Sequence, residues 1–308
     1  LQYSVPGLNI QEQSPGANRI QLRGVNPGTG TGLPIVGTYV DEMGITIDQQ
    51  QRDGAFPLVD LARIEVLRGP QGTLYGEGSM AGTIRYITRN PSLTQTGGFA
   101  EANLFQTDGG GLSRRFSGAF GAPLVDGKVG LRIAAGHDTL AGWIDSPQAG
   151  AKDSNSAKRY FVRPKLLIRP NDALTVSLLY QRYVSDNVSD NYGSVADPQV
   201  RQRKDLFPGK DHSDLANAII TYDLGPVTLT SSTGYQKRDL LFNASLSGGA
   251  IKATFDSNFT QWSQELRVSS NGEGPLQYTA GLWLRKFDSR EDRSATLNGA
   301  PFAPLRRI

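Results

Sequence analysis

The chain contains no cysteine, and its 308 residues include only two histidines and two methionines. The lack of cysteine excludes a disulfide framework and a thiolate metal site, and it fits an exported protein that folds without disulfides. Two isolated histidines provide no oriented base of the kind that a Ser-His-Asp arrangement needs. We therefore expect no enzyme activity, no catalytic residue, no bound metal and no cofactor.

Long apolar runs are also missing from the sequence. A membrane helix needs roughly 20 consecutive apolar residues, and no segment approaches that length. This excludes a helical membrane protein and leaves a closed β-barrel, whose strands hide their apolar face in alternation, as the other way to span a bilayer. The 32 basic and 29 acidic residues are mixed along the chain, so no basic stripe indicates a nucleic-acid partner.

Alternation of apolar and polar residues is frequent from Gly97 onward. Leu174, Val176, Leu178 and Tyr180, for example, occupy every second position of one segment. A period of two predicts strands with one apolar and one polar face. The nine predicted strands are Gly97–Thr107, Leu112–Ala122, Lys128–Ala141, Lys158–Arg169, Ala173–Ser185, Ser213–Leu224, Val227–Leu240, Phe259–Ser270 and Leu276–Arg290.

The side chains of these strands predict two different surroundings. Arg132, Glu265 and Arg267 belong to the polar face and should line a lumen, because a cation facing lipid at the bilayer midplane costs about 2–4 kcal/mol. Aromatic rings are expected to form a girdle at the membrane interface. The candidate girdle residues are Tyr160, Phe161, Tyr180, Tyr183, Tyr222, Tyr235, Trp262 and Tyr278.

The connections between the predicted strands alternate in length after the first pair. Short turns rich in Pro, Gly, Asn and Asp alternate with long polar connections at 142–157, 186–212 and 241–258. This asymmetry is typical of outer-membrane barrels, in which the short turns are periplasmic. A soluble β-sandwich, the alternative for an all-β chain, predicts strands that close on each other without such asymmetry.

The segment from Val59 to Pro91 is organised differently. Two short runs rich in apolar and branched residues, Val59–Val66 and Thr83–Thr88, predict strands on either side of a glycine-rich stretch. Glycine permits positive φ and close approach of the backbone, which suits a compact domain with tight turns. The glycine spacing does not match a dinucleotide-binding loop, since Ala81 stands where the third glycine is required.

The same segment carries a family resemblance. Ile64–Gly76 (IEVLRGPQGTLYG) and Ala81–Ile84 (AGTI) resemble the end of the plug domain of TonB-dependent outer-membrane receptors, and Leu22–Val25 (LRGV) and Val36–Glu42 (VGTYVDE) resemble earlier plug segments. The plug-motif positions that match are Gly24, Gly69, Pro70, Gly72, Tyr75, Gly76 and Gly82.

The resemblance implies a mainly β fold in two parts. Residues 1–92 would be the C-terminal part of a small α+β plug domain, and residues 93–308 would be about nine antiparallel strands of a large transmembrane barrel of the 22-stranded class. The chain would then be a fragment, without signal peptide or energy-coupling box and truncated at both domains. Its open sheet edges would aggregate if it were isolated.

The resemblance also implies a function. The protein would be a ligand-gated importer in the outer membrane of a Gram-negative bacterium, taking up a scarce solute such as a ferric siderophore, a cobalamin or a glycan. Its partners would be that small-molecule ligand, outer-membrane lipid, and TonB with its inner-membrane energising proteins. A passive porin or structural barrel without TonB coupling is the alternative, and a glycine-rich domain inside the lumen argues against it.

Two sets of site residues follow from the resemblance. Arg23 and Arg68 match plug arginines that face acidic residues of the barrel wall, although either could be a solvated surface arginine. Ligand contacts are expected from two loops, which supply basic, aromatic and hydroxyl groups suited to an anionic ferric chelate, although ordinary surface loops would look the same. These residues are Asn26, Thr29 and Thr31 of the first loop and Tyr192, Arg201 and Arg203 of the second.

Overall fold

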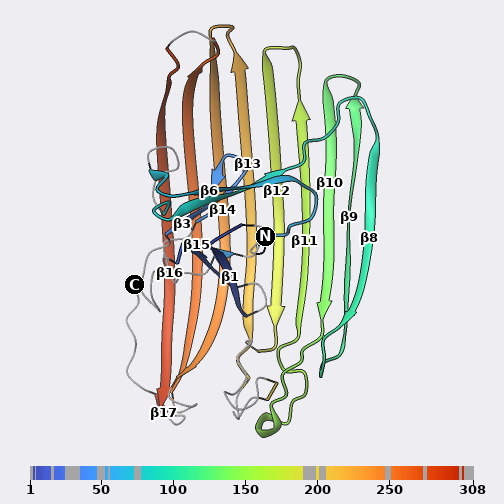
Figure 1. Ribbon diagram of the computed structural model, residues 1–308, viewed down its shortest axis with the longest axis vertical. Coiled ribbons are helices and arrows are strands. Elements are labelled where there is room, and N and C mark those ends of the chain that lie inside the picture. The colour runs from blue at the N-terminus through green and yellow to red at the C-terminus, as the bar shows by residue number, and fades with distance from the viewer. Residues whose placement is uncertain are drawn as a thin grey trace.

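The computed structural model describes residues 3, 5–14, 17–24, 35–46, 53–54, 56–72, 78–189, 199–200, 206–246, 251–272, 276–297 and 300–301. These residues form three β-sheets with ten, four and three strands (Figure 1). Within them we find no helix with the length and apolar character that a membrane crossing requires.

The largest sheet, which we call the wall, consists of ten antiparallel strands that pair in sequence order. Every strand except the two at the edges is hydrogen-bonded to the strands before and after it along the chain, as in a continuous meander (Figure 1). Its strands are β8 (Gly97–Gln106), β9 (Leu112–Val125), β10 (Val129–Leu140), β11 (Ala157–Ile168), β12 (Leu174–Asn187), β13 (Gly209–Asp223), β14 (Val227–Leu246), β15 (Ile251–Ser270), β16 (Thr279–Leu297) and β17 (Ala300–Pro301). A short 3-10 helix, η1 (Pro147–Ala149), lies in the connection between β10 and β11.

All nine predicted strands are present in the wall, and their order is the predicted one. The long polar loop predicted at 241–258 is wrong, because β14 and β15 stay paired as far as Leu246 and Ile251. Polar residues in this segment favour a loop, but the ladder of backbone hydrogen bonds does not depend on side-chain polarity. A single ten-stranded sheet also rules out the β-sandwich alternative for the described residues.

The two faces of the wall differ as a period of two requires. Arg132 and Arg267 lie on the inner face, which is the face turned toward the smaller sheets, as predicted. The predicted girdle is wrong for Phe161 and Tyr183, which are buried on the inner face because each stands out of phase with an outward tyrosine. The other predicted girdle residues, Tyr160, Tyr180, Tyr222, Tyr235, Trp262 and Tyr278, are exposed.

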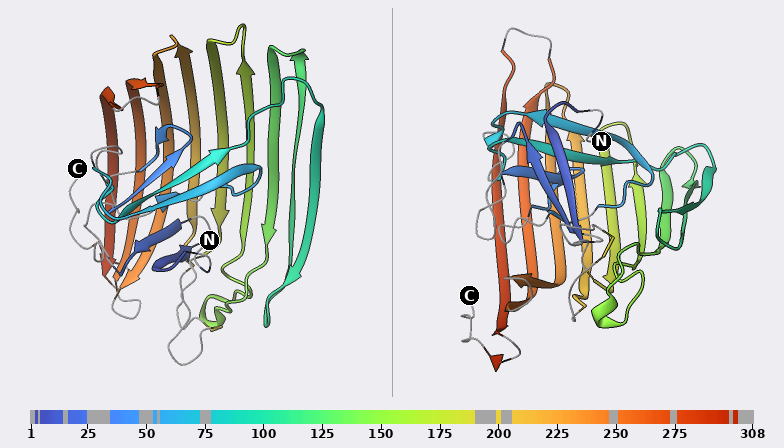
Figure 2. Two further views of the ribbon diagram at one scale, coloured as in Figure 1. Left: turned by 45° about the horizontal axis from the view of Figure 1, so that its top comes forward. Right: turned by 60° about the horizontal axis from the view of Figure 1, so that its bottom comes forward.

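The two smaller sheets, which we call the N-terminal sheets, lie against one face of the wall (Figure 2). One has the strand order β1-β2-β5 and the other has the order β4-β3-β7-β6, in which β3 and β7 are parallel. Their strands are β1 (Leu8–Ser14), β2 (Ala17–Leu22), β3 (Val36–Val40), β4 (Met43–Gly44), β5 (Asp53–Gly54), β6 (Leu61–Arg68) and β7 (Gly82–Thr88). The strands predicted around Val59–Val66 and Thr83–Thr88 are therefore β6 and β7.

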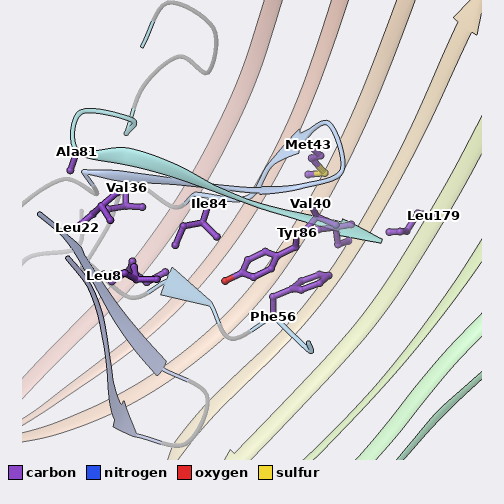
Figure 3. Close-up of a cluster of buried hydrophobic side chains, with 12 residues drawn as sticks. Leu8, Leu22, Val36, Val40, Met43, Phe56, Ala81, Ile84, Tyr86 and Leu179 are labelled. Carbon is purple, nitrogen blue, oxygen red and sulfur yellow. The ribbon is translucent and has the colours of Figure 1, made fainter. Parts of the chain in front are cut away.

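A hydrophobic core joins the N-terminal sheets to the wall. Leu22, Val40 and Ile84 have no solvent exposure, and the same cluster includes Leu179 of β12 and Leu215 of β13. Figure 3 shows this cluster, with Leu179 reaching it from the wall. Fully burying a side chain of this size contributes about 1.5–3 kcal/mol, so the core fixes the N-terminal sheets on the inner face.

Candidate functional site at the contact between the N-terminal sheets and the wall

A buried ion pair connects the end of β3 to the middle of β11. The Lys165 ammonium donates to Asp41 Oδ2 at 2.9 Å and to Thr88 Oγ1 at 2.7 Å. The Thr88 hydroxyl in turn donates to Asp41 Oδ2 at 2.8 Å, and the Thr88 amide donates to Asp41 Oδ1 at 2.8 Å. The side chains of Lys165 and Asp41 are only 6% and 8% exposed, so their charges are compensated by each other and by Thr88 rather than by water.

A second ion pair joins the start of β6 to β10. The Arg132 guanidinium binds the Asp60 carboxylate with two hydrogen bonds, from Nε to Oδ2 at 2.7 Å and from Nη2 to Oδ1 at 2.6 Å. Arg89, from the N-terminal sheets, approaches the same carboxylate at 3.5 Å. Two parallel hydrogen bonds of this kind fix orientation as well as distance. The pair therefore sets the position of Asp60 against the wall.

Arg163, two residues before Lys165 on β11, holds the segment that leads into β6. Its guanidinium donates to the backbone carbonyl oxygens of Val59 and of Asp60, the latter at 3.4 Å, and to the Gln181 side chain at 3.2 Å. It also lies over the ring of Phe56 at 5.2 Å. Because a guanidinium carries five donors in one plane, a single buried arginine can satisfy several carbonyl groups of an irregular segment.

A chain of alternating charges forms a third contact, at β15. Arg63 and Arg85 bind the two oxygens of Glu65 at 2.6 and 2.8 Å, and Arg85 also binds Glu42 at 3.0 Å. The second oxygen of Glu42 accepts from Arg267 of the wall at 3.1 Å. Arg267 is bound as well by Glu265 of its own strand at 3.0 Å. Charges from β6, β7 and β15 are thus linked through Glu42.

Two further wall side chains bind backbone groups at the end of β4 and just beyond it. Gln261 donates to the Gly44 carbonyl oxygen at 2.8 Å, and Arg285 donates to the Thr46 carbonyl oxygen at 3.2 Å. In all of these contacts between the N-terminal sheets and the wall, the wall supplies the donor and the N-terminal sheets supply the acceptor.

The two aspartates that form ion pairs with wall cations have an unusual backbone conformation. Asp41 follows β3 with φ of 50°, and Asp60 precedes β6 with φ of 56°. Aspartate is one of the few residues other than glycine that tolerates this left-handed region. Each turn ends or begins a strand of the four-stranded sheet, so the sheet itself aims the two carboxylates at the inner face.

Open space remains beside these contacts. A cavity of about 470 Å³ lies between the segment Leu58–Ile64 and β8 and β10, and Asp60 and Arg132 both line it. A second cavity, of about 420 Å³, lies between the segment Phe56–Val59 and strands β8 to β12. The N-terminal sheets therefore contact this part of the wall through side chains without filling the space around them.

The plug-motif residues that the structure describes lie in and around the β6–β7 hairpin and at the end of β2. Gly24 and Gly69 have φ of 72° and 99°, and Gly82 begins β7 opposite Arg68. Pro70 and Gly72 follow β6. Tyr75 and Gly76 lie outside the described residues.

Arg23 and Arg68 are both exposed, and no ion pair involves either of them within the described part of the chain. Arg23 stands in a turn after β2, with φ of 58°, rather than in a strand. The expected ligand contacts Asn26, Thr29, Thr31, Tyr192, Arg201 and Arg203 all lie outside the described residues. The roles of these eight residues stay predictions.

Sequence reasoning missed most of the residues that form this contact. Asp41 and Glu42 lie in a matched family segment, but the resemblance assigns them no role, and Lys165 and Arg163 belong to no motif. A signal for the last two is present, since both alternate with the apolar Val162 and Leu166 and therefore belong to the polar face of a predicted strand. Their partners, in contrast, have no local signature in the sequence.

The contact should depend on pH through Glu65. The hydrogen bond from Arg63 lowers the pKa of Glu65 below its ordinary value of 4.5; burial opposes this, while the charges of Arg85 and Arg63 act in the same direction. A carboxylate with a lowered pKa stabilises the fold above its unfolded pKa, and this stabilisation is lost as the pH falls through the folded value. Glu65→Gln should therefore loosen the N-terminal sheets at neutral pH, and its difference from wild type should shrink as the pH falls below 4.5 and vanish below the lowered folded pKa of Glu65.

This difference can be followed by hydrogen exchange of β6 and β7 peptides in the full-length protein across a pH series. Glu101→Gln is a suitable control, because Glu101 is exposed on β8 and contacts Asn103 rather than an arginine. A Glu65→Gln effect that persists unchanged in acid would contradict the role given to the carboxylate.

Comparison with known proteins agrees with this architecture. The family model for the TonB-dependent Receptor Plug Domain matches residues 1–83. Residues 1–83 thus match a plug domain, and the described chain has the fold of the corresponding part of TonB-dependent receptors. The family resemblance and the mainly β fold predicted from the sequence are confirmed.

Particular relatives define the similarity further. The pesticin receptor of Yersinia pestis is 30% identical over 169 residues, which cover 54% of this chain and 24% of that protein. The structure of the ferric yersiniabactin uptake receptor FyuA from Yersinia pestis superimposes with a TM-score of 0.82 at 19% identity, covering 97% of this chain and 47% of that one. For the ferric citrate transporter FecA in its unliganded form the TM-score is 0.76 at 16% identity, covering 99% of this chain and 47% of that one. The chain spans less than half the length of these solved receptors.

Proposed function

We propose that this chain is part of an active transporter of the outer membrane of a Gram-negative bacterium, which imports a ferric siderophore or a similarly scarce solute and is energised by TonB. In this proposal residues 1–92 are the plug and residues 93–308 are strands of the barrel, in contact with outer-membrane lipid. The observation that carries the proposal is the buried set of ion pairs that holds the plug on the inner face of the wall. A passive pore has no need of a domain fixed in its lumen.

The nature of the contact suits a gate. Besides the hydrophobic packing that holds the plug, the Asp60 and Arg132 pair fixes both the distance and the direction of the contact. Such pairs are lost over a short displacement, and water or a solute can replace either partner once the interface opens. A pull on the plug by TonB therefore has a defined set of bonds to break, at β10, β11 and β15.

The exposed arginines extend this proposal to the rest of the barrel. Arg23 and Arg68 do not pair with the described wall, and they are free to meet acidic residues of barrel strands outside this chain, as in the family pattern. Ligand recognition is assigned to the loops that carry Asn26, Thr29, Thr31, Tyr192, Arg201 and Arg203. Two of the similar proteins are named as a receptor for pesticin and as a transporter of ferric citrate. This supports a role in transport without catalysis or a cofactor.

The test is uptake by cells that lack the full-length gene. Such cells should fail to take up radioactive iron from one ferric siderophore while still taking up cobalamin and glycans, and deletion of tonB in the wild type should cause the same defect. Complementation with the full-length gene is the control for polar effects of the deletion. Uptake that does not depend on TonB would favour the passive barrel, and a defect confined to cobalamin or a glycan would reassign the solute.

A further inference from the structure

Three cations lie side by side on the inner face of β10 and β11. Arg132 and Lys165 are directly opposite each other in the strand register, and Arg163 is two residues from Lys165 on the same face. Arg163 and Lys165 are 3% and 5% exposed. Side chains two residues apart on a strand, or opposite each other on neighbouring strands, are within interaction distance, so three like charges here repel one another unless anionic or dipolar groups compensate them.

Apart from the Gln181 side chain of β12, which Arg163 also contacts, the groups that compensate these cations within the described residues come from the plug. Arg132 pairs with Asp60, Lys165 pairs with Asp41, and Arg163 binds the carbonyl oxygens of the segment that ends at Asp60. Within the described part of the chain, Arg132 and Lys165 have no carboxylate partner on the wall. Other charged groups of the inner face differ in this respect. The carboxylates Asp138, Asp211, Glu265 and Glu291 each pair with an arginine of the wall itself.

Displacement of the plug would therefore uncover three closely spaced cations with nothing on the described wall to neutralise them. A cation that is buried and unpaired is costly, whereas the same cation beside a new anion is stabilised. Space for such an anion exists already, since Arg132 lines the first cavity and Arg163 lies over the rings of Phe56 and Phe161, which line the second. A solute with carboxylate, phenolate or similar anionic groups would replace the plug's acceptors group for group.

We infer that Arg132, Arg163 and Lys165 form an anion-binding site on the inner wall, which Asp41 and Asp60 occupy while the plug is seated and which an anionic solute occupies during passage. This inference rests on the proposed function and adds the sign of the solute's charge and the place on the wall where it binds. The plug carboxylates neutralise the three cations while the plug is seated, and the anionic groups of the solute neutralise them during passage.

The experiment measures ion selectivity of the full-length receptor in a planar lipid bilayer, with potassium chloride as the probe. Urea is added stepwise to loosen the plug, and migration on a gel with and without heating checks that the barrel strands stay folded. The reversal potential in a salt gradient then gives the chloride-to-potassium permeability ratio. Arg132→Gln combined with Lys165→Gln should lower this ratio by a factor of about 2 or more, because cations in a narrow cleft raise the local anion concentration.

Matched variants separate the site from general effects of charge. Lys158→Gln removes a cation from β11 at an exposed position on the outer face and should leave the ratio unchanged. If the double glutamine variant does not fold, Arg163→Gln alone provides the same comparison. A ratio that favours potassium, or that the glutamine variants do not change, would overturn the inference. That result would leave the proposed function standing, because uptake that depends on TonB is measured separately.

Discussion

Replacing Lys165 with methionine in the full-length protein should loosen the plug more than any other single change at the interface. The substitution leaves the Asp41 carboxylate buried with Thr88 as its remaining side-chain partner and no cation to balance it. Removing one member of a buried ion pair costs about 3–5 kcal/mol, since the remaining charge keeps its desolvation penalty. Hydrogen exchange of β3 and β7 peptides should accelerate on the order of 10²–10³-fold.

Two variants test whether the loss arises from the unpaired charge. Lys158→Met, on the outer face of the same strand, should leave the exchange unchanged. Adding Asp41→Asn to Lys165→Met should restore most of the protection, because the double variant contains no buried charge at this position and asparagine tolerates the φ of 50°. Equal exchange in Lys165→Met and wild type would show that the core, and not the ion pair, seats the plug.

Replacing Gly82 with alanine should prevent the plug from folding correctly. Gly82 begins β7 opposite Arg68 at φ of 156°, and an added Cβ would fall well inside van der Waals contact of the Leu67 carbonyl oxygen and of Leu22 Cδ2. A clash with backbone is not relieved by rotating a side chain, so the β6–β7 pairing must give way. We expect a cost on the order of 3 kcal/mol, from overpacking together with an unfavourable φ.

Limited proteolysis of the full-length protein in isolated cell membranes measures this effect, since an unfolded plug is cleaved while the paired strands of the wall resist. Gly72→Ala is the matched control, because among the described residues no atom lies within 4 Å of the position that its Cβ would take. The control should give the wild-type digestion pattern. A wild-type pattern for Gly82→Ala as well would mean that the hairpin can shift to admit a methyl group, and that glycine at this position is not required by packing.

The strands and their faces could be read from the sequence because the signal is local. Alternation along Leu174 to Tyr180 needs only neighbouring residues to show it, and the same rule places Arg132 and Arg267 on the inner face without knowledge of any contact. The girdle prediction did not apply this rule to the adjacent Tyr160 and Phe161, and it was therefore wrong for one of the two. The extent of β14 and β15 was missed for another reason, since pairing between strands sustains them through polar residues.

The interface itself depended on the tertiary structure. The sequence by itself determined a plug-like glycine-rich segment, a following set of two-faced strands, and the presence of charged residues on their inner face, because each follows from residue type and short spacing. Only the fold decided that Lys165 meets Asp41 and that Arg132 meets Asp60, across sequence separations of 124 and 72 residues. Which charges pair depends on their distance in space, and the core and the strand register set that distance. The sequence around the charged residues contains no signal for either.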